Sequence, residues 1–145
     1  MGKRTRKKRL PDPVSHIKIE SLAHDGRGVA HRDGKAVFID GALPGESVGF
    51  EYLTTRRKYD EGRVTVIHQA SADRVTPKCQ HFGICGGCSL QHLASEAQIA
   101  AKQQVLLDNL ERIGGVTPQA VLPALTGPAW DYRNKARLGV KDVQK

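Results

Sequence analysis

Between residues 14 and 67 the chain alternates short apolar runs with turn residues, a pattern typical of small β-sheet proteins. Polar and apolar side chains alternate in two of these runs, as expected for strands with one buried face. Five short strands in about 55 residues favour a small, closed or nearly closed β-barrel of the oligonucleotide-binding (OB) type. The predicted strands are His16–Glu20, Val29–His31, Ala36–Ile39, Val48–Tyr52 and Gly62–Ile67.

Turn chemistry divides these strands. Asp33-Gly34 is a strong hairpin signal between the second and third strands. Ala42–Glu46 contains Pro-Gly, which predicts a tight turn, because proline presets one backbone angle and glycine accepts a left-handed one. The segment from Tyr52 to Asp60 is polar and basic, and we expect it to be a loop.

One helix is predicted after the strands, over Ser95 to about Ile113. Ser95 and Gln98 have the spacing of a capping box, and Gly114-Gly115 should end the helix. The apolar residues at helical spacing are expected to pack as ordinary core, and Asp108 and Arg112 form a favourable i, i+4 pair. These apolar residues are Ile99, Leu106, Leu110 and Ile113.

The last segment alternates apolar and polar residues over Ala136–Lys141, which predicts one more strand. A lone strand is not stable, so the sequence looks truncated at Lys145. The expected fold class is therefore α+β: an OB-like barrel, a cysteine-rich loop, one helix and the start of a truncated β domain.

Charge adds a class of partner to this picture. The 145 residues carry 23 Lys and Arg against 15 Asp and Glu, for a net charge of +8. Six of the basic residues lie before Leu10, so the excess is mostly a basic tail that should be disordered until it meets phosphate: Lys3, Arg4, Arg6, Lys7, Lys8 and Arg9. No apolar run approaches the roughly 20 residues of a membrane span, and no secretion signal is evident. We expect a monomer in the cytoplasm with no membrane partner.

Three cysteines, Cys79, Cys85 and Cys88, lie within ten residues and occur nowhere else. An odd, tightly grouped set without a secretion signal favours a metal or cluster site over disulfides. Interspersed glycines permit the tight turns that wrapping an inorganic core needs. Both zinc and a four-iron cluster require a fourth ligand, and two candidates remain open. His92 would give a Cys3His zinc site, and a cysteine beyond Lys145 would give a [4Fe–4S] cluster.

Several segments resemble a known family. Ser21–Ala30, Gly34–Ile39 and Leu43–Glu46 are similar to a TRAM domain, and Cys79–Leu93 is similar to the cluster loop of RNA uracil-C5 methyltransferases, nearest to those that modify 23S rRNA. Trp130–Arg137 resembles the start of that family's central domain. Radical methylthiotransferases, which also carry TRAM domains, differ in cysteine spacing and domain order.

The resemblance implies that the three cysteines bind a [4Fe–4S] cluster whose fourth ligand lies outside this chain. It also implies that S-adenosylmethionine binds a C-terminal domain, which holds the catalytic cysteine and carboxylate. No catalytic residue is therefore expected here, and the chain alone should be inactive. The alternative from the residues alone is a standalone RNA-binding module with the Cys3His zinc site.

Ribosomal RNA is the implied partner, and basic side chains are the candidate contacts. Beyond the tail these are Arg27, Arg32, Arg56, Arg57, Lys58, Arg133, Lys135 and Arg137, with Tyr52 and Tyr59 as candidate stacking residues. Tyr52 alternates with Val48 and Phe50, which favours a place in the core. The expected organisation is a tail at 1–11, the TRAM domain at 12–70, the iron–sulfur loop at 71–94, the helix at 95–115 and the central-domain start at 116–145.

Overall fold

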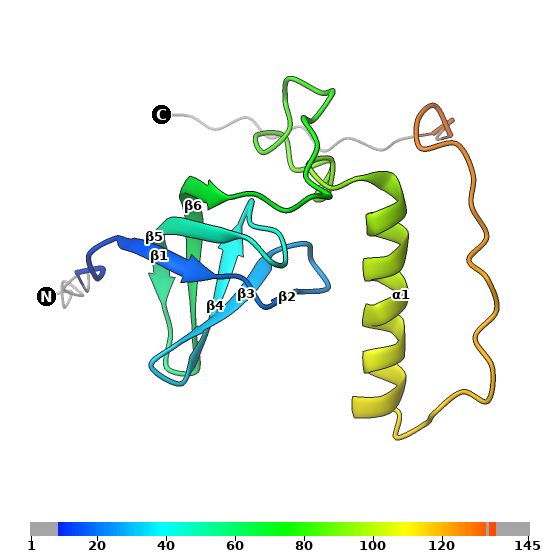
Figure 1. Ribbon diagram of the computed structural model, residues 1–145, viewed down its shortest axis with the longest axis horizontal. Coiled ribbons are helices and arrows are strands. Elements are labelled where there is room, and N and C mark those ends of the chain that lie inside the picture. Colours follow the sequence, from blue (N-terminus) through cyan, green and yellow to red (C-terminus); the bar gives the residue numbers. More distant parts are fainter. Residues whose placement is uncertain (1–8, 133, 136–145) are drawn as a thin grey trace, which may run out of the picture.

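The computed structural model describes residues 9–132 and 134–135, which form a six-stranded sheet followed by a long loop and one helix (Figure 1). The sheet order is β1-β5-β6-β4-β3-β2, so β1 and β2 are its two edges and the strand ladder does not close within the described residues. All neighbours are antiparallel except β4 and β6. The elements are β1 Val14–Lys18, β2 Ser21–Leu22, β3 Gly28–Arg32, β4 Lys35–Asp40, β5 Ser47–Thr55, β6 Tyr59–Gln69 and α1 Ser95–Arg112.

This topology corrects two expectations. The sheet has six strands where five were predicted, because the two-residue strand β2 has no alternation of its own to reveal it. The predicted loop from Tyr52 to Asp60 is also wrong: β5 runs to Thr55 and β6 begins at Tyr59. Only Arg56–Lys58 connect the two strands, and the Arg56 amide donates to the Tyr59 carbonyl at 2.9 Å. Polar residues here belong to paired strands, because β5 and β6 bond to each other up to Thr55 and Asp60.

The hairpin between β3 and β4 confirms the Asp33-Gly34 signal. Arg32 pairs directly with Lys35, so the turn has two residues, and both have positive φ, 52° at Asp33 and 75° at Gly34. Aspartate and glycine tolerate this left-handed conformation better than other residues do, which is why the dipeptide sets the register of the hairpin.

Alternating apolar side chains from the strands form one core. The largest fully buried apolar side chains lie on β4, on β5, in the turn between them and, for Ile19, between β1 and β2; Tyr52 is also buried, as its spacing predicted. The core residues are Ile19, Ala30, Val37, Ile39, Ala42, Val48, Phe50 and Tyr52. This cluster holds the sheet together independently of α1, whose residues are absent from it.

α1 spans almost the predicted range, but its start and its apolar face differ from prediction. Ala94 is the N-cap residue and no side chain caps the helix, so the proposed capping role of Ser95 is wrong. The predicted stop is confirmed: Gly115 has a φ of 62°, and the Val116 amide donates to the Leu110 carbonyl at 2.9 Å.

The apolar face of α1 is not core in the described structure. None of its residues is buried, and Leu106 and Ile113 are 57% and 82% exposed. Asp108 accepts a hydrogen bond from Gln104 at 2.8 Å, a partner that charge spacing did not predict. Figure 1 shows α1 standing beside the sheet, connected to it through the loop that follows β6. The predicted strand at 136–141 lies outside the described residues. Among the described helices none is long and apolar enough to span a membrane.

Candidate cysteine loop and basic hairpin

A buried ion pair fastens the chain after β6 to the sheet. Glu46, fully buried in the turn before β5, accepts hydrogen bonds from Arg74 Nε at 2.6 Å and Nη2 at 2.9 Å. The amides of Leu43 and Ser71 also donate to this carboxylate, at 2.9 and 3.1 Å. Burial raises the pKa of Glu46, but Arg74 and the two amides outweigh it, so the net pKa lies below the ordinary value. Glu46 is therefore a charged anchor inside the fold.

The cysteine loop, residues 75–92, begins and ends at this anchor. Arg74 forms an antiparallel bridge with Leu93, and the Val75 amide donates to the His92 carbonyl at 3.0 Å. The Ala94 amide in turn donates to the Asp73 carbonyl at 2.8 Å. Leu93 is buried at this point, so the two ends of the loop leave the fold side by side.

The last residues of the cysteine loop, Ser89 and Leu90, pack against the turn between β2 and β3. Gly26 there is buried with a φ of 91°, and a Cβ on it would lie 3.0 Å from the Ser89 Cβ and 3.2 Å from Leu90 Cδ2. Only glycine suits this contact, because both its backbone angle and the space around it exclude a side chain. From the other side, Gln98 of α1 donates to the carbonyls of Leu90 and Leu93 at 3.0 and 2.8 Å. Sheet and helix therefore both position the loop.

Within the loop the three cysteines are accessible to different extents. Cys79 is partly buried, and Cys85 and Cys88 are exposed. Gly83 and Gly86 have φ values of 80° and 69°, which confirms the expectation of tight left-handed turns between the cysteines. These turns present the last two thiols at the surface of the loop.

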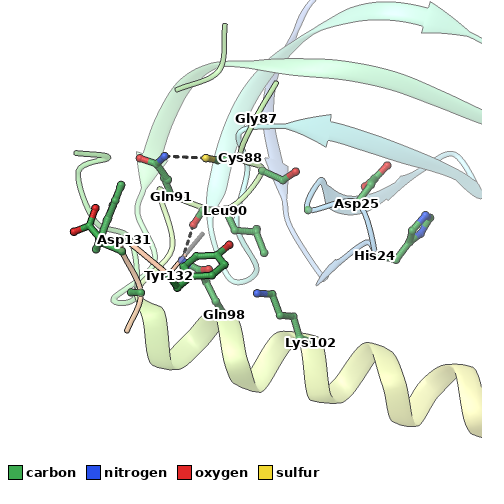
Figure 2. A pocket seen from close by; sticks show the side chains of 14 residues that line it. His24, Asp25, Gly87, Cys88, Leu90, Gln91, Gln98, Lys102, Asp131 and Tyr132 are labelled. Carbon is green, nitrogen blue, oxygen red and sulfur yellow. Dashed lines mark hydrogen bonds between the residues drawn. The ribbon is translucent and has the colours of Figure 1, made fainter. Parts of the chain in front are cut away.

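Two of the thiol sulfurs already accept N–H hydrogen bonds. Gln91 Nε2 donates to Cys88 Sγ at 3.0 Å, drawn as a dashed line in Figure 2, and the Gly87 amide donates to Cys85 Sγ at 3.4 Å. Such donors stabilise thiolates that bind a metal or an iron–sulfur cluster. Thiolates that accept N–H hydrogen bonds are the kind of ligand that an iron–sulfur cluster requires. However, the described residues hold no group of three potential ligands close enough to bind one metal ion.

His92, the fourth ligand of the zinc alternative, is withdrawn from the loop surface. It is only 3% exposed, and neither ring nitrogen has a hydrogen-bond partner among the described residues. Burial lowers its pKa to about 4, aided by the positive charge of Arg74 and opposed by Glu46. Its ring centroid lies 5.2 Å from that of Phe82. His92 is therefore a neutral, packed residue, and the structure does not gather it with the cysteines into a zinc site.

A cavity of about 600 Å³ opens beside Cys88 (Figure 2). The turn between β2 and β3, the cysteine loop, α1 and residues 129–132 line it, with Lys102 and Trp130 among the lining side chains. The cavity was not predicted, because its walls come from four separate parts of the chain. It shows that the cysteine loop faces an open space shared with the helix.

Basic side chains gather at the opposite end of the sheet. Arg56, Arg57 and Lys58 are all exposed at the tip of the hairpin between β5 and β6. Because β4 pairs in parallel with β6, with Ala36 opposite Tyr59, the turn between β3 and β4 lies beside this tip. β6 has 11 residues and runs from this tip past the cysteine loop, which lines a cavity together with Arg63 and Val64 of β6.

Other candidate RNA contacts have mixed outcomes. Arg27 is engaged within the protein: it forms ion pairs with Asp25 at 2.8 Å and Glu61 at 3.0 Å and lies over the Phe38 ring. Arg32 is 45% exposed and donates to the Tyr52 hydroxyl at 3.2 Å. Arg9 and Lys135 are exposed. The remaining candidates lie outside the described residues: Lys3, Arg4, Arg6, Lys7, Lys8, Arg133 and Arg137.

Comparison with known proteins identifies the sheet and relates the whole chain to one class of enzyme. Residues 14–65 match the TRAM domain family. The chain is 54% identical over 145 residues to the 23S rRNA (uracil(1939)-C(5))-methyltransferase RlmD of Methylococcus capsulatus and 54% identical over 139 residues to that of Alcanivorax borkumensis. It is 58% identical over 130 residues to that of Xanthomonas euvesicatoria.

These alignments cover 100%, 96% and 88% of this chain, but 33%, 31% and 29% of the relatives. The chain therefore spans about a third of the length of the curated relatives that it matches. The zinc-binding standalone module is not favoured by these similarities. Residues 14–65 are thus similar to the TRAM domain family, and the chain along its whole length resembles the RNA uracil-C5 methyltransferases of 23S rRNA, as its motifs predicted.

Proposed function

We propose that this chain supplies the RNA-binding and cysteine-loop part of an S-adenosylmethionine-dependent methyltransferase that forms 5-methyluridine in 23S rRNA. The observation that carries the proposal is the 54% identity to RlmD of Methylococcus capsulatus over all 145 residues. S-adenosylmethionine and the catalytic groups would belong to the remaining two thirds of such a protein. No catalytic residue is assigned within this chain, and the chain alone would be inactive.

RNA would bind first through charge. The exposed side chains of Arg56, Arg57 and Lys58 stand together on one hairpin tip, and none of them has an acidic partner among the described ion pairs. Tyr59, 37% exposed at the start of β6, would stack with an unpaired base beside them. The basic residues at 3–9 and at 133–137 would extend this contact along the RNA.

Cys79, Cys85 and Cys88 would bind three corners of a [4Fe–4S] cluster, with a fourth cysteine outside this chain. The exposure of Cys85 and Cys88 leaves their sulfurs available, and the N–H donors of Gly87 and Gln91 suit bound thiolates. The cluster would supply a covalent link between the cysteine loop and a second domain. The loop would need to draw its three thiols closer together on binding.

The expected domain organisation remains a proposal on the same grounds: the tail at 1–11, the TRAM domain at 12–70, the cluster loop at 71–94, the helix at 95–115 and the central-domain start at 116–145. The monomeric state and the cytoplasmic location remain predictions.

Methyl transfer to 23S rRNA tests the activity. The protein expressed from its full reading frame should transfer the labelled methyl group of S-adenosylmethionine to one uridine, and residues 1–145 alone should transfer none. Incorporation by the 145-residue chain would contradict the assignment of catalysis to the rest of the protein.

Salt-dependent RNA binding tests the hairpin tip. Replacing Arg56, Arg57 and Lys58 by serine should weaken binding and reduce the slope of log affinity against log salt by about 2, since each lost single-strand phosphate contact changes it by roughly 0.7. The control replaces three exposed residues of α1 by serine and should not reduce the slope. These residues are Glu96, Gln104 and Glu111. An unchanged slope in the hairpin variant would place the RNA elsewhere.

Metal analysis separates the cluster from the zinc alternative. Protein purified without air should contain iron and absorb broadly in the visible range. Colourless protein with one zinc ion per chain would favour the Cys3His module instead.

A further inference from the structure

Gln91 occupies a special place in the cysteine loop because its side chain contacts two of the three cysteines. Its Oε1 accepts the Cys79 backbone N–H at 3.3 Å, and its Nε2 donates to the Cys88 sulfur at 3.0 Å. Cys79 and Cys88 are the first and last cysteines of the loop, nine positions apart. One amide therefore joins both ends of the cysteine segment.

The backbone on both sides of Gln91 is held in place. Gln91 is partly buried, and it follows Leu90, whose carbonyl accepts a hydrogen bond from Gln98 of α1 at 3.0 Å. The next residues, His92 and Leu93, are buried and join the paired base of the loop. In Figure 2 the Gln91 amide points at Cys88 along one wall of the cavity. Because its backbone is anchored, the amide can set where the two cysteines lie.

We propose that Gln91 is a positioning residue for the metal site of this loop, in two ways. Its carbonyl oxygen holds the backbone of Cys79 near Cys88 before any metal arrives. Its N–H group then donates to the Cys88 thiolate once that sulfur carries negative charge. The inference rests on the proposed cluster and assigns a role to a residue that is not a ligand.

Hydrogen bonding to a ligand sulfur has a measurable electronic effect. An N–H donor stabilises negative charge on the sulfur, and reduction of an iron–sulfur cluster adds negative charge, so the donor raises the reduction potential. A residue that only shaped the loop would change how much iron binds, but not the potential of the clusters that form. The potential therefore distinguishes the two roles.

The test compares two substitutions of Gln91 in the full-length protein, purified without air. Gln91→Leu removes both contacts at similar size without changing the charge, so its potential reports the loss of the N–H donor. Gln91→Glu keeps an oxygen for the Cys79 amide, has no N–H to donate at neutral pH and adds a negative charge that lowers the potential further. We expect both to lower the reduction potential, and Gln91→Leu to speed iron release to a chelator by roughly 10-fold or more. Gln80→Leu, at an exposed glutamine of the same loop, is the control and should behave as the wild type.

Each outcome has a distinct meaning. Wild-type potential and iron release in both Gln91 variants would overturn the inference, and so would equal effects of Gln80→Leu. If Gln91→Leu stays folded by circular dichroism but retains no iron, the positioning role is supported.

The cluster proposal can be wrong independently of the role of Gln91. If the wild-type protein retains zinc but no iron, the cluster proposal fails, and Gln91→Leu should still weaken Zn²⁺ binding by roughly 10-fold. If it retains neither metal, both proposals are overturned.

Discussion

At the scale of single residues, Glu46 joins the turn before β5 to the chain that follows β6, a link that no sequence pattern indicates. Its carboxylate receives two backbone amides and two nitrogens of Arg74, and Arg74 Nη2 also donates to the Gly41 carbonyl at 2.6 Å. The sequence around Glu46 predicted only a turn. Full burial of its charge follows from a partner 28 positions away, which local pattern cannot reveal.

Glu46→Gln should destabilise the fold by about 3 kcal/mol, because it leaves the largely buried Arg74 guanidinium without its counter-charge at a fully buried position. Urea unfolding at pH 7, followed by circular dichroism, measures this change. Asp33→Asn is the matched control, because Asp33 is 93% exposed and forms only a long 3.7 Å ion pair with Arg32. That control should change the free energy of unfolding by less than about 0.5 kcal/mol. A similar value for Glu46→Gln would contradict the anchoring role.

His92 gives a second prediction at this scale, in the pH dependence of stability. Its folded-state pKa of about 4 lies below its ordinary value of 6.5, so the unfolded chain takes up the proton first as pH falls. The contribution of His92 to the free energy of unfolding is therefore complete above pH 6.5. It declines by about 3 kcal/mol as the pH falls from 6.5 to 4.

His92→Leu should abolish this part of the pH dependence, measured as the free energy of unfolding at several pH values. His81→Leu, at an exposed histidine of the same loop, should retain it. A wild-type pH profile in His92→Leu would mean that other groups cause the decline.

At the scale of elements, the start of α1 departs from its sequence signal. Ser95 and Gln98 have capping-box spacing, yet Ala94 takes the N-cap place and Gln98 turns back to Leu90 and Leu93. The pairing of Ala94 with Asp73 at the loop base moves the helix start one residue earlier. A tertiary contact has therefore overridden a local preference.

Ala94→Ser should consequently stabilise the helix by about 0.5–1 kcal/mol, because a hydroxyl at this position can accept the amides that are free in the first turn. Ser95→Ala should be close to neutral. Thermal unfolding followed at the helix band of circular dichroism compares them. If Ser95→Ala proves the more damaging change, the cap assignment from sequence would be right after all.

The elements also show what sequence could and could not predict. Short apolar runs bounded by turn residues placed β1 and β3 to β6 approximately, and Asp33-Gly34 fixed a hairpin by its own backbone preferences. The two-residue strand β2, the extension of β5 to Thr55 and the bridge at Arg74 depend on pairing with distant chain. The three cysteines were evident from spacing, whereas Gln91 carried no signal, because its role exists only once the loop brings Cys79 and Cys88 together.

At the scale of the whole molecule, the sheet and the helix differ in what holds them. The sheet buries a continuous apolar cluster, but α1 buries none of its residues and presents Leu106 and Ile113 to the surface. Within the described residues, the stability of the sheet should not depend on this face of α1.

Leu106→Glu combined with Ile113→Glu should therefore change the free energy of unfolding of the sheet by less than about 0.5 kcal/mol in this chain. Urea titration followed by the strand signal of circular dichroism reports the sheet, which contains all the strands of the described residues. Val48→Ala is the positive control and should cost about 2 kcal/mol through lost packing in the core. A comparable loss in the helix variant would show that α1 supports the sheet.

The paired base of the cysteine loop has a consequence for how such proteins can diversify. Because the chain leaves at Arg74 and returns at Leu93, the exposed residues around Cys85 can be lengthened without shifting any strand, provided that residues 89–92 keep their contacts with the sheet and α1. Doubling the length of such a loop costs only about 0.6 kcal/mol in closure entropy. The position is thus a natural point of insertion, at which one sheet could host loops with quite different ligands.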